Sequence, residues 1–260
     1  MMTRLARTGP GRSMSRMIEV DSLVKRYGDK VAVDGLSLAV EGGEVFAFLG
    51  PNGAGKTTTI KVMAGLLRPT SGTVAIAGHD IVREPEAAKS RMAYVPDEPY
   101  LYDKLTGREF LHFVAELYGI ERPKADERIE ELSKLFDFAG YMDELCEGYS
   151  HGMSQRVVVG SALVHDPDVL LIDEPFVGLD PRSARHLKDS FRELTSRGTT
   201  VFLSTHTLGI AQEMADRICI IHHGRTIALG TPEEIGARER DLEEIFLELT
   251  EEPAETVEPE

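Results

Sequence analysis

Gly50 is followed by four residues and then by Gly55-Lys56-Thr57, which is the pattern G-x-x-x-x-G-K-[ST]. The pattern comes directly after EVFAFL, a short and almost continuously apolar run that is typical of a buried strand. Apolar residues at helical spacing follow, so the sequence predicts a strand, a glycine-rich loop and a helix in succession. In such a loop, backbone N–H groups converge at the positive end of a helix and attract anions. The segment therefore predicts a phosphate-binding loop in an α/β sheet.

The loop positions have separate expected roles. Gly53 and Gly55 allow the backbone to bend around phosphate oxygens. Lys56 would reach the β- and γ-phosphates, and the Thr57 hydroxyl is placed to bind Mg²⁺. We expect the whole loop to contact the nucleotide: Gly50, Pro51, Asn52, Gly53, Ala54, Gly55, Lys56, Thr57 and Thr58.

Two acidic residues end another apolar run, VLLIDEP. Because the carboxyl ends of parallel strands meet at one edge of a sheet, Asp173 would lie beside the phosphate loop, where it could hold Mg²⁺. Glu174 is the next residue and could accept a proton from an attacking water. The alternative is a pair of acidic residues that merely end a strand.

His206 follows the apolar run TVFLST and would lie at the same edge of the sheet. A neutral imidazole there could hydrogen-bond the γ-phosphate or orient the water beside Glu174. The remaining histidines have no such placement and are expected to be structural: His79, His112, His151, His165, His186, His222 and His223.

The order of the segments predicts an α/β core that is interrupted by helices. Apolar spacing predicts that the helix after the loop continues to Leu67, just before Pro69. Thr106 and Glu109 form a capping-box pattern ahead of an amphipathic helix in the middle of the chain. Strand-like runs before this helical block and β–α alternation after it favour a mainly parallel sheet flanked by helices.

The same patterns divide the chain. Met17 opens the first strand-like run, and we hypothesise that the natural start lies there. The last residues, EEPAETVEPE, have the acidic, proline-containing composition of a solvated tail. The expected parts are a flexible arm (1–16), an ATP-binding α/β core (17–97 and 166–235), a helical subdomain (98–165), a C-terminal helix (236–250) and an acidic tail (251–260).

Charge and hydropathy exclude several classes of protein. The formal net charge of −15 is opposite in sign to that of a typical nucleic-acid binder, so nucleic acid is not expected as a main partner. No apolar run reaches the ~20 residues that cross a bilayer. The basic N-terminal segment lacks the apolar core of a secretory signal. We therefore expect neither a signal peptide nor a transmembrane segment.

With these motifs in order, the chain resembles the nucleotide-binding subunit of ATP-binding cassette (ABC) transporters over about residues 17–235. GPNGAGKTT corresponds to the Walker A motif and VLLIDEP to Walker B. GLDP resembles the D-loop, with Asp180 as its acid, and His206 matches the switch histidine. Tyr27 stands where the family has an aromatic residue that stacks on adenine. The resemblance implies ATP and Mg²⁺ as cofactors.

The resemblance also implies the ABC ATPase fold. This fold is an α/β P-loop NTPase core with a mainly parallel sheet, an N-terminal antiparallel β region and an inserted helical subdomain.

The segment YSHGMSQR aligns with the family signature L-S-G-G-Q. Ser150 and Gly152 occupy signature positions, whereas Tyr149, His151 and Met153 replace the leucine, first glycine and glutamine. In the family, two cassettes pair head to tail and each signature completes the ATP site of the other. The resemblance implies that Ser150 donates to phosphate and that Gly152 allows a close approach. Met153 would contribute its backbone N–H.

A larger departure is YVPDEP, where Asp97 replaces a glutamine that senses Mg²⁺ in the family. Our hypothesis is that Asp97 approaches the metal, directly or through water, together with Thr57 and Asp173. The alternative is a turn aspartate between two prolines, a position that suits an Asx-turn.

The implied activity is ATP hydrolysis coupled to transport, with Lys56, Glu174 and His206 as the catalytic residues. The implied partners are a second ATP-binding subunit, identical or paralogous, and a separate integral membrane permease that docks near Asp97. The chain would then lie at the cytoplasmic face of the cell membrane, held there by the permease. EPYLYDKLTGREFL and the single short cassette resemble exporters of the ABC-2 type most closely.

Two alternatives remain open at this point. One is a soluble, non-transport ABC ATPase that acts on ribosomes or DNA, although such relatives usually carry two cassettes or long coiled-coil insertions. The other is a nucleotide-dependent regulator with low turnover, which the altered signature and Asp97 would suit. The transported substrate cannot be predicted, because specificity would reside in the permease.

Overall fold

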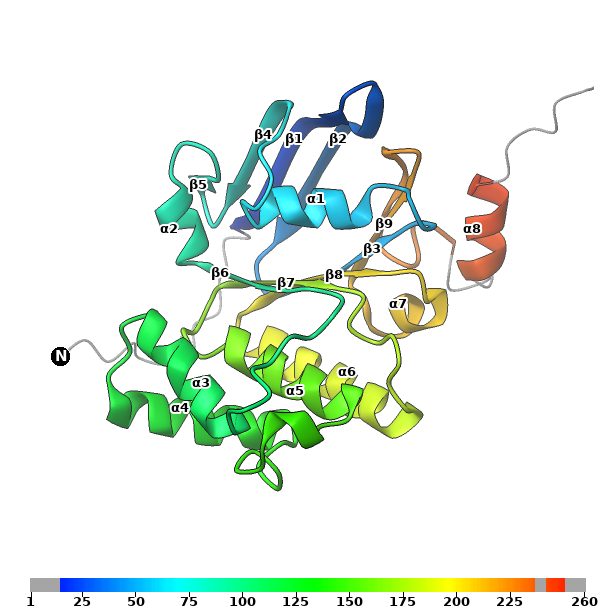
Figure 1. The fold of residues 1–260 in the computed structure, drawn as a ribbon. Coiled ribbons are helices and arrows are strands. Elements are labelled where there is room, and N and C mark those ends of the chain that lie inside the picture. The colour runs from blue at the N-terminus through cyan, green and yellow to red at the C-terminus, as the bar shows by residue number, and fades with distance from the viewer. Residues whose placement is uncertain (1–14, 237–241, 251–260) are drawn as a thin grey trace, which may run out of the picture.

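The computed structural model describes residues 15–236 and 242–250. The expected arm up to residue 14 and the expected acidic tail at 251–260 lie outside these residues. Within the described residues, the strands form one four-stranded and one six-stranded sheet (Figure 1).

The smaller sheet is antiparallel and has the strand order β2-β1-β4-β5. Its strands are β1 (Arg16–Tyr27), β2 (Lys30–Glu41), β4 (Ser71–Ile76) and β5 (His79–Asp80). Buried and exposed side chains alternate along parts of β1 and β2, as expected for a sheet with one covered face. The antiparallel β region that the resemblance implied is therefore present.

The larger sheet has the order β10-β9-β3-β8-β7-β6 and is parallel except at β10, which pairs antiparallel with β9. Its strands are β3 (Val45–Leu49), β6 (Met92–Val95), β7 (Val169–Asp173), β8 (Thr200–Thr205), β9 (Arg217–His222) and β10 (Arg225–Gly230). All residues of β3, β7 and β8 are buried, which explains the apolar runs at residues 45–49, 169–172 and 201–203.

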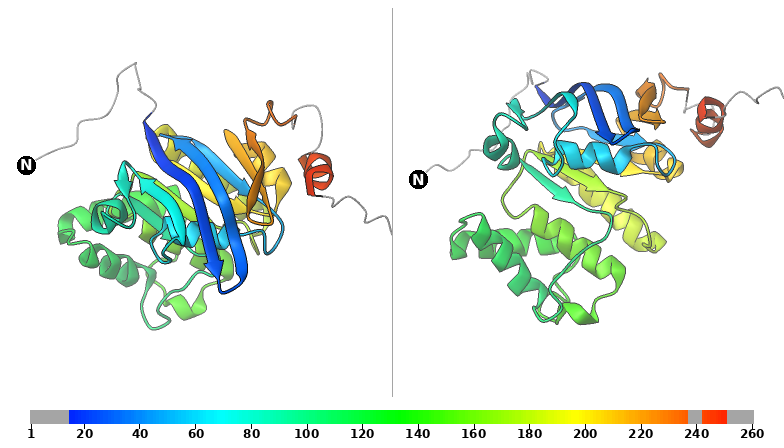
Figure 2. Two further views of the ribbon diagram at one scale, coloured as in Figure 1. Left: turned by 90° about the horizontal axis from the view of Figure 1, so that it is seen from above. Right: turned by 45° about the horizontal axis from the view of Figure 1, so that its top comes forward.

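Helices lie on both faces of the larger sheet. In Figure 1, α1 lies between the two sheets, whereas α3 to α6 lie on the other side of the larger sheet. The helices are α1 (Lys56–Met63), α2 (Pro85–Lys89), α3 (Gly107–Leu117), α4 (Arg122–Leu135), α5 (His151–Ala162), α6 (Pro181–Ser196), α7 (Leu208–Met214) and α8 (Leu242–Thr250), with a 3₁₀ turn at Cys146–Gly148. The views in Figure 2 show the antiparallel sheet lying across α1.

The alternation of side chains along β3 separates two apolar cores. Phe46 and Phe48 pack with α1 and the antiparallel sheet, whereas Val45, Ala47 and Leu49 pack with the helices of the opposite face. Burial of both faces holds β3 in place and thereby fixes the point at which the phosphate loop begins. The expected fold class is confirmed.

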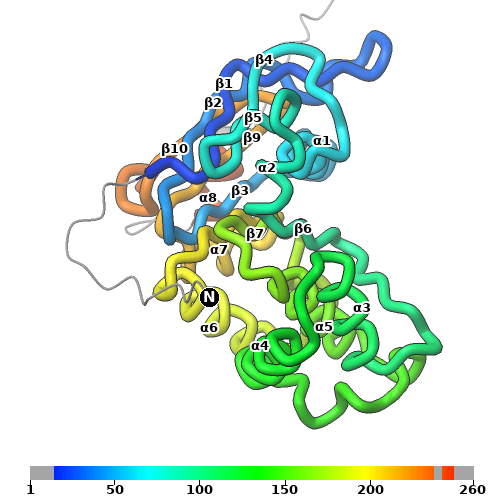
Figure 3. The backbone as a smooth tube through the Cα atoms, turned by 90° about the vertical axis from the view of Figure 1, so that its left-hand side faces the viewer, coloured from blue at the N-terminus to red at the C-terminus, as the bar shows by residue number. Residues whose placement is uncertain are grey.

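The helices α3, α4 and α5 gather at the end of the molecule opposite β1 and β2 (Figure 3). The capping box at the start of α3 is formed as expected. The backbone N–H of Glu109 donates to the Thr106 hydroxyl at 3.2 Å, and the backbone N–H of Thr106 donates to the Glu109 carboxylate at 2.8 Å.

One helix boundary differs from the sequence prediction. We expected the helix after the phosphate loop to continue to Leu67, but α1 ends at Met63. Gly65 has a φ of 65°, and the N–H groups of Leu66 and Leu67 both turn back to the carbonyl of Lys61. This left-handed glycine ends the helix before Pro69 can act, which apolar spacing alone does not reveal.

Candidate active site

The phosphate loop joins the end of β3 to the start of α1. Gly55 caps α1 with a φ of 108°, a conformation that glycine adopts readily. A Cβ at Gly55 would lie 2.4 Å from the carbonyl oxygen of Ala32, and one at Gly50 would lie 2.6 Å from that of Ile221. These glycines are therefore needed for two reasons: the loop bends sharply, and its backbone lies directly against β2 and β9. Among the described residues no side chain caps α1, so its first N–H groups remain available to an anion.

Lys56 is the first residue of α1, and its side chain is buried within the loop. Its Nζ donates to the carbonyl oxygen of Gly50 at 2.7 Å and lies 3.5 Å from Oε1 of Glu174. The ammonium group is thus held between the loop and the carboxylate from β7. A phosphate in the loop would meet this charge at short range, with little solvent between them.

The acidic residues are arranged by the pairing of β7 with β8, in which Asp173 lies opposite Ser204. The Ser204 hydroxyl donates to the Asp173 carboxylate and accepts from the backbone N–H of Glu174 at 3.2 Å. Glu174 has a φ of 48°, in the left-handed region that residues with a Cβ rarely adopt. The chain turns sharply here, and the carboxylate of Glu174 comes within reach of both Lys56 and His206.

His206 follows β8, the strand next to β7. Its Nδ1 lies 2.9 Å from Oε2 of Glu174, and its backbone N–H donates to the same oxygen at 3.3 Å. The carboxylate favours a proton on Nδ1, so a neutral ring in this geometry orients Glu174 and has no second N–H for a phosphate. A protonated ring could donate to both groups. The two roles expected for His206 therefore correspond to two charge states of the ring.

The Asp173 carboxylate is a candidate ligand for Mg²⁺. Burial raises its pKa, and the charges of Asp97 and Glu174 raise it further, whereas hydrogen bonds from Ser204 and Thr57 lower it. Its Oδ2 is buried and has no hydrogen-bond partner among the described residues. A divalent cation would relieve both the unpaired oxygen and the repulsion between the carboxylates.

The set of donors also fits this ion, because Mg²⁺ prefers oxygen ligands and usually takes only one or two carboxylates besides phosphates and water. The described residues contain no group of three His, Cys, Asp or Glu side chains that could hold a metal by themselves. Asp97 follows β6 and is exposed. Its charge raises the pKa of both Asp173 and Tyr94, which indicates that it faces this edge of the sheet.

Tyr27 ends β1, and Lys25 Nζ lies 5.2 Å from the centre of its ring. The ring is 48% exposed. Tyr27 pairs with Lys30 at the start of β2, and Ala32 on the same strand contacts Gly55 of the phosphate loop. The hairpin therefore brings an exposed aromatic ring to the side of the loop, where it could stack on a base.

The segment that resembles the signature begins α5. Ser150 caps this helix, and its exposed hydroxyl accepts from the backbone N–H of Met153 at 3.3 Å. A Cβ at Gly152 would lie 3.4 Å from the Leu179 side chain, an ordinary van der Waals distance. Within one subunit, Gly152 thus lies against the segment before α6, whereas Met153 accepts a hydrogen bond from the Tyr141 hydroxyl through its carbonyl oxygen.

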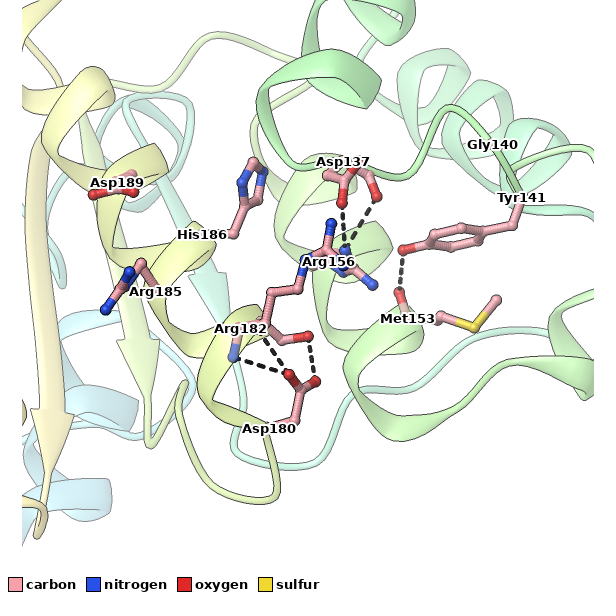
Figure 4. A pocket seen from close by; sticks show the side chains of 11 residues that line it. Asp137, Gly140, Tyr141, Met153, Arg156, Asp180, Arg182, Arg185, His186 and Asp189 are labelled. Carbon is pink, nitrogen blue, oxygen red and sulfur yellow. Dashed lines mark hydrogen bonds and ion pairs between the residues drawn. The ribbon is translucent and has the colours of Figure 1, made fainter.

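Asp180 caps α6, accepting from the backbone N–H groups of Arg182 at 2.9 Å and Ser183 at 3.1 Å. The hydrogen bond from the Ser183 hydroxyl is the main reason that the pKa of Asp180 is lowered. A cavity of about 710 Å³ lies between α5, α6 and the turn before Tyr141 (Figure 4). In it, Arg156 pairs with Asp137 at 3.1 Å.

The sequence is similar to that of a known family. The family model described as ABC transporter matches residues 33–177, more than half of the chain. The chain belongs to the ABC transporter ATP-binding family. A second family model, of an AAA domain, matches only residues 150–211. The activity of an ABC ATP-binding protein is ATP hydrolysis, and this chain is accordingly an ATPase.

Two relatives and two structures illustrate the similarity. This ABC protein is 43% identical over 220 residues to the daunorubicin resistance ATP-binding protein DrrA3 of Streptomyces coeruleorubidus, covering 85% of this chain and 70% of the relative. It is 38% identical over 238 residues to the ABC transporter ATP-binding protein NatA of Bacillus subtilis (strain 168), covering 89% and 97%.

Among solved structures, an ATP-binding subunit of an ABC transporter superposes with a TM-score of 0.83 and 35% identity, covering 90% of this chain and 100% of that one. A nucleotide-free ATP-binding cassette from an ABC transporter gives a TM-score of 0.78 and 26% identity, covering 89% and 99%.

The structure brings together part of the residue set expected for an ABC active site. Glu174 contacts both Lys56 and His206, and Thr57 lies next to Asp173. Ser150, Gly152 and Asp180 lie in a second region, around the starts of α5 and α6. These three, with Met153, remain predicted nucleotide contacts.

Sequence reasoning missed Ser204, which holds both Asp173 and the backbone of Glu174. One signal could have revealed it. Ser204 is the second-to-last residue of an apolar strand, and it lies opposite a carboxylate at the end of the neighbouring strand. No helix in the described part of the chain has the length and apolar character needed to cross a membrane.

Proposed function

We propose that this ABC ATPase pairs head to tail with a second ATP-binding subunit around Mg²⁺-ATP and drives export through a separate membrane permease. The observation that carries the hydrolytic part is the contact of Lys56, Glu174 and His206 at one sheet edge. The pairing is supported by the separate position of the signature segment, whose Ser150 hydroxyl is exposed and makes its contact within α5.

This geometry supports a proposed role for each group in hydrolysis. Lys56 and the N–H groups of α1 would hold the β- and γ-phosphates, which removes most of the conformational freedom of the reacting group. Glu174 would accept the proton of the attacking water, and His206 fixes the orientation of that carboxylate. When bound by Asp173 and Thr57, Mg²⁺ would supply charge neutralisation at the phosphates. Asp97 is proposed to approach that ion through water.

Trapping a dimer tests the pairing. Glu174→Gln keeps the size of the side chain but removes the base, so we expect ATP to bind without turnover and kcat to fall by about 10²- to 10⁴-fold. Light scattering of this variant should show a monomer without nucleotide and a dimer with Mg²⁺-ATP. Lys56→Ala is the control and should remain monomeric, because its loop loses the phosphate contact. Brisk turnover by Glu174→Gln would contradict the assigned base.

An exposed aromatic patch supports docking of a membrane permease. Tyr100, Tyr102 and Phe113 are 71%, 46% and 40% exposed, and their rings meet edge to face. The patch begins three residues after Asp97, so it connects the metal-facing edge to the helical part of the molecule. A cavity of about 650 Å³ lies beside it, between α3 and α4. Of the three rings, only Phe113 lines this cavity. Clustered, exposed aromatic rings are typical of a protein interface.

This patch predicts the effect of one substitution. Tyr100→Ser should weaken co-purification with the proposed permease by roughly tenfold, since large aromatic residues dominate interface affinity. Basal ATPase activity should stay unchanged. Leu66→Ser is the control, because Leu66 is also an exposed apolar residue but lies after α1. Equal losses for both variants would show that the patch has no special part in docking.

Export is proposed from the names of the relatives. They include proteins for daunorubicin resistance, linearmycin resistance and Nod factor export. Through the permease, the chain would lie at the cytoplasmic face of the cell membrane. The net charge of −15 supports the proposal that nucleic acid is not a partner.

A further inference from the structure

The start of α5 contacts the segment that precedes α6. His151 is the first residue of α5, and its Nε2 lies 3.0 Å from the carbonyl oxygen of Val177. A Cβ on the next residue, Gly178, would lie 3.1 Å from the His151 ring. A Cβ at Gly152 would lie 3.4 Å from Leu179. Residues 177–179 therefore line up against the first two residues of the signature helix.

The chemistry of this contact determines which atom donates. The carbonyl of Val177 can only accept, so Nε2 of His151 carries the proton. The bond forms with either a neutral or a protonated ring, since Nε2 is a donor in both. Gly178 has a φ of 73° and leaves space for the ring. A glycine in place of His151, as in the signature pattern, could not make this bond.

Outside this bond, the segment has weak support. The N–H groups of Val177 and Leu179 each donate within the turn at 3.3 Å, to Glu174 and Phe176. Val177 is 47% exposed. Leu179 is half-buried and packs against the apolar core, whereas Val177 and Gly178 are exposed. A hydrogen bond from outside the turn should therefore restrict residues 177 and 178 substantially.

We infer that His151 is a positioning residue, which fixes residues 177–179 to the start of α5 before nucleotide binds. This inference rests on the proposed pairing, in which the signature segment and the D-loop (Gly178–Pro181) meet the second subunit together. Ordering the two segments in advance lowers the entropy that pairing must remove. Loss of the bond should therefore raise the ATP concentration needed for pairing and leave kcat nearly unchanged, because His151 touches none of Lys56, Glu174 and His206 in this structure.

Hydrogen exchange of the nucleotide-free protein tests the bond without any pairing. In His151→Ala and His151→Gly, amide exchange at residues 177–179 should accelerate about fivefold, as expected for the loss of a neutral hydrogen bond. His151→Gln can donate from its amide and should restore most of the protection. His79→Ala is the matched control, because His79 also bonds through its ring, to Glu84 at 3.2 Å, but lies on β5. Unchanged exchange in His151→Ala would overturn the inference.

Nucleotide titration tests the consequence. In the Glu174→Gln background, His151→Ala should raise the Mg²⁺-ATP midpoint for dimer formation about fivefold, and His151→Gln should return it toward the parent value. With Glu174 intact, KM for ATP should rise by a similar factor at fixed protein concentration, with kcat preserved. A midpoint that stays the same or falls would overturn the inference while leaving the pairing intact. Failure of Glu174→Gln itself to dimerise would instead refute the proposed function.

Discussion

At the residue scale, Glu174 combines a strained backbone with three charged or polar neighbours. Its φ of 48° costs on the order of 1–3 kcal/mol for a residue of this kind. The backbone N–H of Glu174 donates to the Ser204 hydroxyl, and the backbone N–H of His206 donates to the Glu174 carboxylate, so two hydrogen bonds hold the turn in place. The strain places the carboxylate between Lys56 and His206, which regular strand geometry would not allow.

The position of Asp173 suits Mg²⁺ binding but lowers the stability of the folded protein. Because burial raises its pKa above 3.8, the ionised side chain destabilises the folded protein at neutral pH when no cation is bound. Asp173→Asn should retain the bond from Ser204 and remove the charge. We therefore expect a higher thermal midpoint in chelator at pH 7, together with loss of Mg²⁺-dependent ATPase activity.

The pH dependence of the thermal midpoint tests the sign of this effect. The increase in thermal midpoint caused by Asp173→Asn should be constant above the raised pKa of Asp173. It should shrink as pH falls through that pKa and disappear below 3.8, where the wild-type carboxyl is protonated in both the folded and the unfolded state. Asp29→Asn is the control, since Asp29 has an exposed carboxylate in the turn between β1 and β2, and the substitution should leave the thermal midpoint nearly unchanged. A lower midpoint for Asp173→Asn at pH 7 would contradict the assigned cost of burial.

At the element scale, α3 depends on its N-terminal cap. Thr106→Ala would remove the side-chain acceptor for the Glu109 N–H and half of the reciprocal pair. We expect a loss of about 1 kcal/mol in the free energy of unfolding, and a thermal midpoint lower by about 2–4 °C. Ser196→Ala, at the C-terminal end of α6, is the control and should change the midpoint little. Equal shifts for both variants in a thermal scan would show that the capping box contributes nothing.

The relation between α5 and α6 is a second property of elements. Asp180 fixes the start of α6, and His151 connects the preceding residues to the start of α5. Both are side-chain to backbone bonds, so each constrains where a helix begins relative to its neighbour. The cavity beside them remains open and is lined mainly by polar residues.

At the scale of the whole molecule, much of the active site could be predicted because it follows from strand ends. Asp173 ends an apolar run, His206 follows one, and the loop that leads to Lys56 follows a third, and parallel strands bring such ends to one edge. This prediction of the site did not require the order of the strands within the sheet. The antiparallel region followed from the family resemblance.

Other features depend on packing that no local pattern encodes. The bond between His151 and Val177 joins positions 26 residues apart, and sequence reasoning assigned His151 only a structural role. The end of α1 at Met63 was also missed, because a left-handed Gly65 overrode the apolar spacing. The predicted contacts of Ser150 and Gly152 with nucleotide involve a second subunit, which the geometry of one chain cannot test.

Complementation between two inactive variants tests the head-to-tail pairing most directly. Lys56→Ala disables the phosphate loop, and Ser150→Arg blocks the signature segment, so each variant alone should lack any complete site. Because neither variant can build a complete site with itself, the dimers that form in an equimolar mixture contain both variants, and each has one complete site out of two. We predict up to about one half of the wild-type ATPase rate for the mixture, given a two-fold pair with independent sites. A mixture that stays at the background rate of the separate variants would contradict the account.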